Sequence, residues 1–98
     1  MLKTSYSKTG TICRVTFKYG NPENAENAVI AGDFNGWSLK DNPMKKLKNG
    51  SFSATLSLQA GKSYRFRYVL NGSSWVNDEE AHRYTANDYG EDDSVVVV

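Results

Sequence analysis

Alternation of apolar and polar residues is the feature that most constrains the fold of this chain. Between Ser51 and Leu58 every second residue is apolar, and the same period of two recurs over Thr11–Tyr19 and Tyr64–Leu70. Successive side chains of a β-strand point to opposite faces, whereas an amphipathic helix repeats every 3.6 residues or so, and no segment shows a helical stripe. The pattern therefore predicts half-buried β-strands along most of the chain.

Turn-forming residues separate these segments. Asn49-Gly50 directly precedes Ser51–Leu58 and predicts a type I′ hairpin turn whose partner strand is Met44–Leu47. Asn71-Gly72 predicts a second hairpin, which leads to a strand containing Trp75. The other strands are expected at Thr11–Tyr19, Ala28–Gly32, Tyr64–Leu70 and Val95–Val98. About seven short strands separated by turns predict an all-β fold, an antiparallel β-sandwich.

The size and charge of the chain exclude several classes of protein. Its 98 residues predict a single domain spanning residues 1–98, too small for a (β/α)₈ barrel or for a dinucleotide-binding domain joined to a substrate domain. Twelve Lys and Arg nearly cancel eleven Asp and Glu, giving a net charge of +1. This balance provides no general electrostatic reason to bind nucleic acid or an anionic membrane, so neither is expected as a partner.

The single cysteine and the amino-terminal segment bear on the cellular compartment. Cys13 has no second cysteine to pair with, which excludes an internal disulfide and a cysteine-based zinc site. Its place in the alternation predicts a buried core thiol. Residues 1–6 lack the apolar stretch of a secretory signal, and no segment approaches the roughly 20 apolar residues of a membrane span. A cytoplasmic location is expected.

Carboxylates are the residues that could carry catalysis or hold a metal, and they cluster in the polar segment between Asp78 and Asp93. Nothing in that segment indicates the burial that raises a carboxyl pKa, so a solvated acidic loop is predicted. The only histidine, His82, accompanies no nucleophile motif. The spacing from Asp88 to Asp93 does not match a calcium-binding loop. We therefore expect no catalytic residue, no metal site and no cofactor.

The two tryptophans are more informative. Trp37 follows Gly32-Asp33-Phe34-Asn35-Gly36, a run of turn residues in which an indole is difficult to bury. The position of Trp75 depends on the length of the hairpin loop before it. A two-residue loop places Trp75 opposite Tyr68 on the core face, and a three-residue loop places it opposite Val69 on the outer face.

The three-residue loop would bring Trp75 together with Arg67 and Asn77 on an exposed sheet. These side chains suit a sugar, because the C–H face of a pyranose lies flat on an indole while its hydroxyls bind guanidinium and amide groups. The alternative is that Trp37 and Trp75 are both core residues of a small sandwich. The residues alone leave the two interpretations open.

Two motifs add a family resemblance. Val29–Ser38 (VIAGDFNGWS) and Phe66–Trp75 (FRYVLNGSSW) together resemble the family-48 carbohydrate-binding modules. These are early-set, immunoglobulin-like sandwiches found on isoamylases, glycogen branching enzymes and the β subunits of AMP-activated protein kinase. The chain looks most similar to short bacterial proteins that consist of this domain alone. The resemblance extends over approximately residues 15–98 and implies an immunoglobulin-like (early-set) β-sandwich.

The resemblance also implies which residues bind sugar. Trp37 and Trp75 match the family's two stacking tryptophans, and Arg67 matches its basic residue. Tyr89 is the nearest counterpart of an apolar residue that reaches the sugar ring, and Asp93 falls near an Asn that binds hydroxyls. The chain departs from the family at Glu91, where a Thr is usual, and in a hairpin one residue longer than that of the kinase-type members.

Three functions follow as hypotheses. The favoured one is non-catalytic binding of an α-glucan, the α-1,4-linked glucose of glycogen or starch, in which Trp37 and Trp75 stack on the sugar while Arg67 and Asn77 donate to hydroxyls. The second is an accessory module that docks an amylase-type enzyme such as an isoamylase or a branching enzyme, using an exposed edge at Val95–Val98. The third is a small glycosidase, against which the small size of the chain argues.

Overall fold

The fold is an all-β sandwich. The computed structural model describes residues 2–98, which form nine strands and a single-turn 3₁₀ helix, η1, at Asp33–Asn35. The strands are β1 (Leu2–Tyr6), β2 (Ile12–Tyr19), β3 (Ala28–Gly32), β4 (Lys45–Lys46), β5 (Phe52–Gln59), β6 (Ser63–Leu70), β7 (Ser74–Val76), β8 (Arg83–Ala86) and β9 (Asp92–Val97). Within this range no helix has the length and apolar character needed to cross a membrane.

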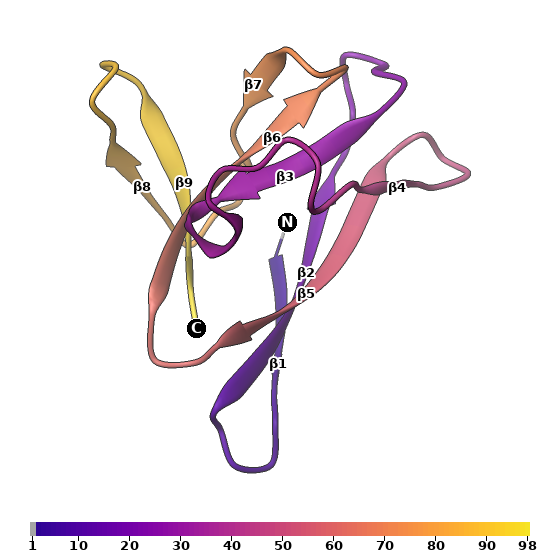
Figure 1. Ribbon diagram of the computed structural model, residues 1–98. Coiled ribbons are helices and arrows are strands. Elements are labelled where there is room, and N and C mark those ends of the chain that lie inside the picture. Colours follow the sequence, from indigo (N-terminus) through magenta and orange to yellow (C-terminus); the bar gives the residue numbers. More distant parts are fainter. Residues whose placement is uncertain (1) are drawn as a thin grey trace.

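The strands form two antiparallel sheets. The four-stranded sheet has the order β1-β2-β5-β4, and the five-stranded sheet has the order β3-β6-β9-β8 with β7 paired to β6. In Figure 1 the β1–β2 hairpin extends beyond the rest of the molecule, and the β8–β9 hairpin stands at the opposite side of the view. The antiparallel β-sandwich predicted from the alternation is confirmed.

The core forms between the inner faces of the two sheets, as the alternation requires. Cys13, Val15 and Phe17 of β2 are fully buried, and so are Phe66 and Tyr68 of β6. The rings of Phe17 and Phe66 meet edge to face across the core with their centroids 5.0 Å apart. The intervening residues of β6 therefore point outward, away from the core.

The β6–β7 hairpin resolves the alternatives for Trp75. Asn71 and Gly72 adopt φ angles of 50° and 76°, the left-handed conformation required by a type I′ turn. The strands pair Leu70 with Ser74, however, so the loop has three residues. Trp75 consequently lies opposite Val69, on the outer face of the five-stranded sheet.

The other predicted hairpin turn is of a different type. Gly50 has φ of 88°, but Asn49 does not adopt the positive φ that a type I′ turn requires at both central positions. Instead the Leu47 N–H donates to the Ser51 carbonyl at 2.7 Å, and the Gly50 N–H donates to the Leu47 carbonyl at 2.9 Å. This is a three-residue loop that ends in a left-handed glycine. Its partner strand shortens to Lys45–Lys46.

The structure differs from the prediction in the number of strands and in the exposure of the edge at Val95–Val98. β1 and β8 were not expected, and β9 begins at Asp92, three residues before the predicted strand. β6 pairs with one side of β9, and on the other side β8 pairs with Asp92–Val95 while the Val97 N–H donates to His82 Nδ1 at 2.9 Å. Near its end the Val98 N–H donates to the Lys62 carbonyl at 2.9 Å. The edge at Val95–Val98 is therefore partly covered, at Val95 by β8 and at Val97 by His82, and docking of a partner enzyme there stays a prediction.

Most carboxylates of the acidic segment are exposed, as predicted, but the aspartates at its two ends, Asp78 and Asp93, are buried. Asp78 is 1% exposed and accepts a hydrogen bond of 2.6 Å from the hydroxyl of Tyr68. The backbone N–H of Asp78 donates to Ser94 Oγ at 2.9 Å. Asp78 thus anchors the start of this segment to the core, and burial together with the Asp78 carboxylate raises the pKa of the Tyr68 hydroxyl.

We expect the free energy of unfolding to fall as the pH rises above the ordinary tyrosine pKa of 10.0. There Tyr68 in the unfolded chain loses its proton while folded Tyr68 keeps it, so the folded form binds more protons. The decline should approach about 1.4 kcal/mol per pH unit for this tyrosine. Burial and a hydrogen bond to Glu23 also raise the pKa of Tyr19, so this second tyrosine makes the decline steeper.

Urea unfolding between neutral pH and about pH 11 measures this effect. A Tyr68→Phe variant should lose about 1–3 kcal/mol at neutral pH, because Asp78 loses a buried donor. It should also show a shallower alkaline decline than the wild type. Equal alkaline slopes in the two proteins would contradict the assignment.

Candidate functional site

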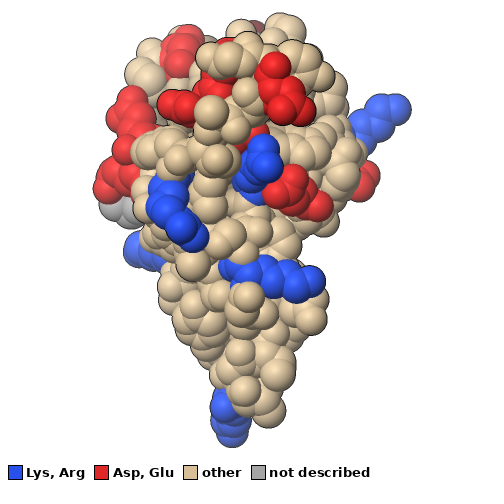
Figure 2. Space-filling model, turned by 90° about the vertical axis from the view of Figure 1, so that its left-hand side faces the viewer, with Lys and Arg blue, Asp and Glu red and all other residues tan. Residues whose placement is uncertain are grey.

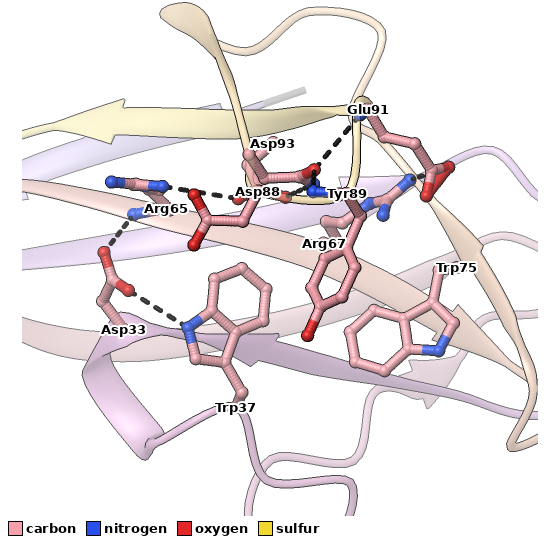
Figure 3. A pocket seen from close by; sticks show the side chains of 10 residues that line it. Asp33, Trp37, Arg65, Arg67, Trp75, Asp88, Tyr89, Glu91 and Asp93 are labelled. Carbon is pink, nitrogen blue, oxygen red and sulfur yellow. Dashed lines mark hydrogen bonds and ion pairs between the residues drawn. The ribbon is translucent and has the colours of Figure 1, made fainter.

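A groove of about 790 Å³ lies on the outer face of the five-stranded sheet. Its walls come from the β3–η1 turn, from β6 and β7, and from the turn between β8 and β9 (Figure 3). The lining residues are Asp33, Trp37, Arg65, Arg67, Trp75, Asn87, Asp88, Tyr89, Glu91 and Asp93. Segments distant in sequence therefore converge on one depression, which contains five of the six residues predicted to bind sugar.

Trp37 is held at the groove by an unusual backbone conformation. Its φ of 60° lies in the left-handed region, which is costly for a residue with a Cβ atom. The Trp37 N–H donates to the Gly32 carbonyl at 2.9 Å. Asn35 secures the same turn by accepting from the backbone N–H of Gly32 and Ser38. Strain of this kind is typical of functional positions, where surrounding contacts maintain it.

Asp33 fixes the orientation of the Trp37 indole. One carboxylate oxygen accepts from Trp37 Nε1 at 3.1 Å, and the other accepts from the Arg65 backbone N–H at 3.0 Å. The carboxylate thus ties the indole to strand β6. The sequence analysis did not identify Asp33 as part of the site. The available signal was its position four residues before Trp37 in a tight turn, close enough to accept from the indole N–H.

The two indoles lie side by side in the groove. The ring centroids of Trp37 and Trp75 are 6.3 Å apart and the ring planes are inclined by 37°. Trp75 is 40% exposed and Trp37 is half-buried. The interpretation of both tryptophans as core residues is therefore wrong, and the pair forms an angled aromatic surface open to solvent.

Arg67 lies beneath this surface and is more buried than the exposed cation predicted from the sequence. Its side chain is 11% exposed, and Nη2 lies 3.6 Å from a carboxylate oxygen of Glu91. Its Nε is buried and has no hydrogen-bond partner within residues 2–98. Nε is buried out of a ligand's reach, but Nη2 lies beyond hydrogen-bond distance of Glu91 and can donate to a further acceptor in the groove.

The turn between β8 and β9 forms the opposite wall. Asn87 organises it, because its side-chain oxygen accepts from the N–H groups of Tyr89 and Glu91 at 2.9 and 3.1 Å. Tyr89 is 88% exposed and extends toward the two indoles (Figure 3). The sequence analysis did not identify Asn87 as part of the site. The available signal was an Asn followed by a Gly three residues later, which is typical of a β-turn.

Asp93 lines the groove, but its carboxylate already interacts with two residues of the fold. It is 4% exposed, accepts from Asn87 Nδ2 at 3.1 Å and lies 3.9 Å from Arg65 Nη1. It therefore braces the turn and one arginine.

Asn77 is the one predicted residue that the structure does not bring to the groove. Its amide nitrogen donates to the Asp92 carbonyl at 2.8 Å, and its oxygen accepts from Ser94 Oγ at 2.9 Å. Because β7 ends at Val76, the continued strand that would have placed Asn77 beside Arg67 does not form. Both polar ends of the Asn77 amide serve the fold.

The groove carries a negative formal charge. Two arginines and four carboxylates line it, which gives a formal charge of −2. Figure 2, viewed from the side of β8 and β9, shows acidic side chains gathered over the upper part of this face with basic side chains among and below them. Such a surface disfavours a polyanion such as nucleic acid. Within residues 2–98, no three His, Cys, Asp or Glu side chains gather in an arrangement suited to a metal ion.

Comparison with known proteins identifies the family. The model of carbohydrate-binding module 48, the isoamylase N-terminal domain, matches residues 6–90. The chain is 39% identical over 57 residues to Protein PTST homolog 2, chloroplastic, of Arabidopsis thaliana, an overlap of 58% of this chain and 10% of that protein. It is 32% identical over 60 residues to the 1,4-alpha-glucan branching enzyme GlgB of Deinococcus radiodurans, an overlap of 60% of this chain and 8% of that enzyme.

The chain spans about a tenth or less of the length of these relatives. The family match, by contrast, covers most of the chain and includes both tryptophans and Arg67. The family is one of binding modules and not of catalytic domains. With its immunoglobulin-like sandwich and its aromatic groove, this chain belongs to the carbohydrate-binding module 48 family.

Proposed function

We propose that the protein binds α-glucan, the α-1,4-linked glucose of glycogen and starch, in the groove between Trp37 and Trp75, without catalysing a reaction. The observation that carries the proposal is the pair of indoles open to solvent, with the Arg67 guanidinium in the same groove. The family membership supports a carbohydrate ligand, and the branching enzyme among the relatives supports a glucan.

The tryptophans would supply most of the binding free energy. A pyranose presents an apolar face of C–H groups to an indole and excludes water from it. At about 25 cal/mol per Å², partial coverage of one indole by a glucose ring contributes about 1–3 kcal/mol. Arg67 supplies polar selectivity by donating to a hydroxyl. Much of the ligand stays in water in such an open groove, so binding should be weak for each site.

The angle between the indoles favours a curved chain. α-1,4-linked glucose follows a helical path, so successive rings turn relative to one another. β-1,4-linked glucose forms a flat ribbon, whose successive apolar faces match coplanar aromatic rings. Two indoles inclined by 37° suit the first geometry better than the second.

Association with a glycan-active enzyme is compatible with this function, because a module that holds a polysaccharide brings its chain ends near the partner. The part of β9 that β8 leaves without a strand partner, beyond Val95, is the surface that such an enzyme could pair with. The negative charge of the groove further supports a neutral ligand over nucleic acid or an anionic membrane.

Isothermal titration with maltoheptaose tests the proposal, with a β-1,4-linked oligosaccharide of similar length as the control. We expect saturable binding of maltoheptaose and none of the control. Because the ligand is uncharged, Kd should change by less than about twofold between about 0.05 and 0.5 M salt. Equal affinity for the two oligosaccharides, or a steep loss of affinity with salt, would contradict the proposal.

A further inference from the structure

Arg67 and Glu91 form a loose ion pair in the wall of the groove. The two residues come from β6 and from the β8–β9 turn, and their nearest charged atoms are 3.6 Å apart. Charge-assisted hydrogen bonds between such groups are usually about 2.7–2.9 Å long. The two groups are therefore close enough for electrostatic attraction, but they are too far apart to form a hydrogen bond with each other.

Each partner retains unused capacity. Arg67 Nη2 lies 3.6 Å from Glu91, outside hydrogen-bond distance, so this nitrogen can still donate to a ligand, whereas Nε is buried out of a ligand's reach. The Glu91 side chain is 60% exposed, and an ionised carboxylate accepts about four hydrogen bonds. The neighbouring carboxylates of Asp33 and Asp93 are already hydrogen-bonded to the fold.

A donor group beside an acceptor group matches the chemistry of adjacent hydroxyls on a sugar ring. A hydroxyl both donates and accepts, so one hydroxyl can accept from a guanidinium while its neighbour donates to the carboxylate. The spacing of two equatorial hydroxyls on neighbouring carbons is close to that of a hydrogen bond, which is compatible with the 3.6 Å between Arg67 and Glu91.

We propose that Arg67 and Glu91 together form a binding site for a vicinal diol, and that Glu91 determines specificity by accepting a hydrogen bond from the sugar. The inference rests on the proposed glucan-binding function and deepens it. Trp37 and Trp75 would recognise the apolar face of the ring, which many sugars share. The ion pair would recognise the relative orientation of two neighbouring hydroxyls, which differs between sugars.

Calorimetric titration of Glu91→Ala, Glu91→Gln and Arg67→Met with maltoheptaose tests this inference. We expect Glu91→Ala to weaken binding by about tenfold, as for a lost hydrogen bond to a charged group. Glu91→Gln should recover part of the affinity, because its amide oxygen still accepts. Glu26→Ala, which removes an exposed carboxylate in another loop, should bind as the wild type does.

A double-mutant cycle separates recognition from structural support. If the two residues bind one diol together, Glu91→Ala should cost little further affinity in the Arg67→Met background. Thermal unfolding of each variant shows whether a loss of binding comes from a loss of fold. Unchanged or tighter binding by a folded Glu91→Ala protein would overturn the inference, since Glu91 would then be neutral or obstructive.

The same experiment distinguishes failure of this inference from failure of the proposed function. If the wild type and Glu91→Ala bind maltoheptaose equally while Trp75→Ala, titrated alongside them, binds it more weakly, glucan binding stands and the diol site is wrong. If the wild type shows no binding, both are overturned.

Discussion

Trp75→Ala is expected to weaken maltoheptaose binding by about 5- to 150-fold and to leave the domain folded. The variant removes one of the two indoles of the groove, and with it the apolar surface that a glucose ring covers, which is worth about 1–3 kcal/mol. The fold should tolerate the change, because Trp75 is 40% exposed on the outer face of the sheet and contributes no buried core surface.

Fluorescence titration measures this effect, since Trp37 remains as the reporter in the variant. Tyr6→Ala is the matched control, because Tyr6 is an exposed aromatic residue, 54% accessible, on β1 of the other sheet. Its affinity should equal that of the wild type. A Trp75→Ala protein that binds maltoheptaose with wild-type affinity would exclude Trp75 from the binding surface.

Gly32→Ala is expected to be the most crowded of the glycine-to-alanine changes and to destabilise the fold strongly. A Cβ atom at this position would lie 2.5 Å from the Arg65 carbonyl oxygen and 2.9 Å from the ring of Phe34. The backbone there is extended, with φ of −169°, a conformation that alanine adopts readily. The cost therefore comes from the lack of space for a methyl group. Overpacking against a backbone atom of a central strand should cost about 3 kcal/mol.

For a domain of this size, that cost lowers Tm by about 10–20 °C. Gly20→Ala is the matched control, because a Cβ atom there would have no neighbour within 4 Å and the residue has no positive φ. Its Tm should stay within a few degrees of the wild type. Equal melting temperatures for the two variants would show that β3 and β6 move apart at little cost.

Gly32→Ala also tests how the site is built. Gly32 accepts the hydrogen bond from the Trp37 N–H that closes the turn, so a shift of Gly32 displaces the indole. We therefore expect weaker maltoheptaose binding by the folded fraction of this variant.

The long central strands could be predicted from the sequence because each has one buried face. Alternation over β2, β5 and β6 specified which residues enter the core, and Phe17 and Phe66 meet there as expected. β1 gave no such signal, since four of its five residues are exposed at the edge of a sheet. β8 has only four residues, and the two aspartates that begin β9 are unusual in strands.

The site was predictable to the extent that its residues are large or charged. Trp37, Trp75 and Arg67 were identified and do line one groove. The residues that orient them were not identified. Asp33 accepts from the backbone of Arg65, on a strand distant in sequence, and Asn87 organises a local turn whose place beside the indoles only the folded sheet determines. Asn77 was placed by assuming that β7 continues, and the strand ends one residue earlier.

The central claim is that both tryptophans contact one α-glucan chain, and the indole N–H resonances of the protein test it most directly. The chain contains only two tryptophans, so Trp37→Phe and Trp75→Phe variants assign the two signals. On addition of maltoheptaose, both wild-type signals should shift and saturate with the same Kd. A titration in which maltoheptaose shifts neither indole signal would contradict the account.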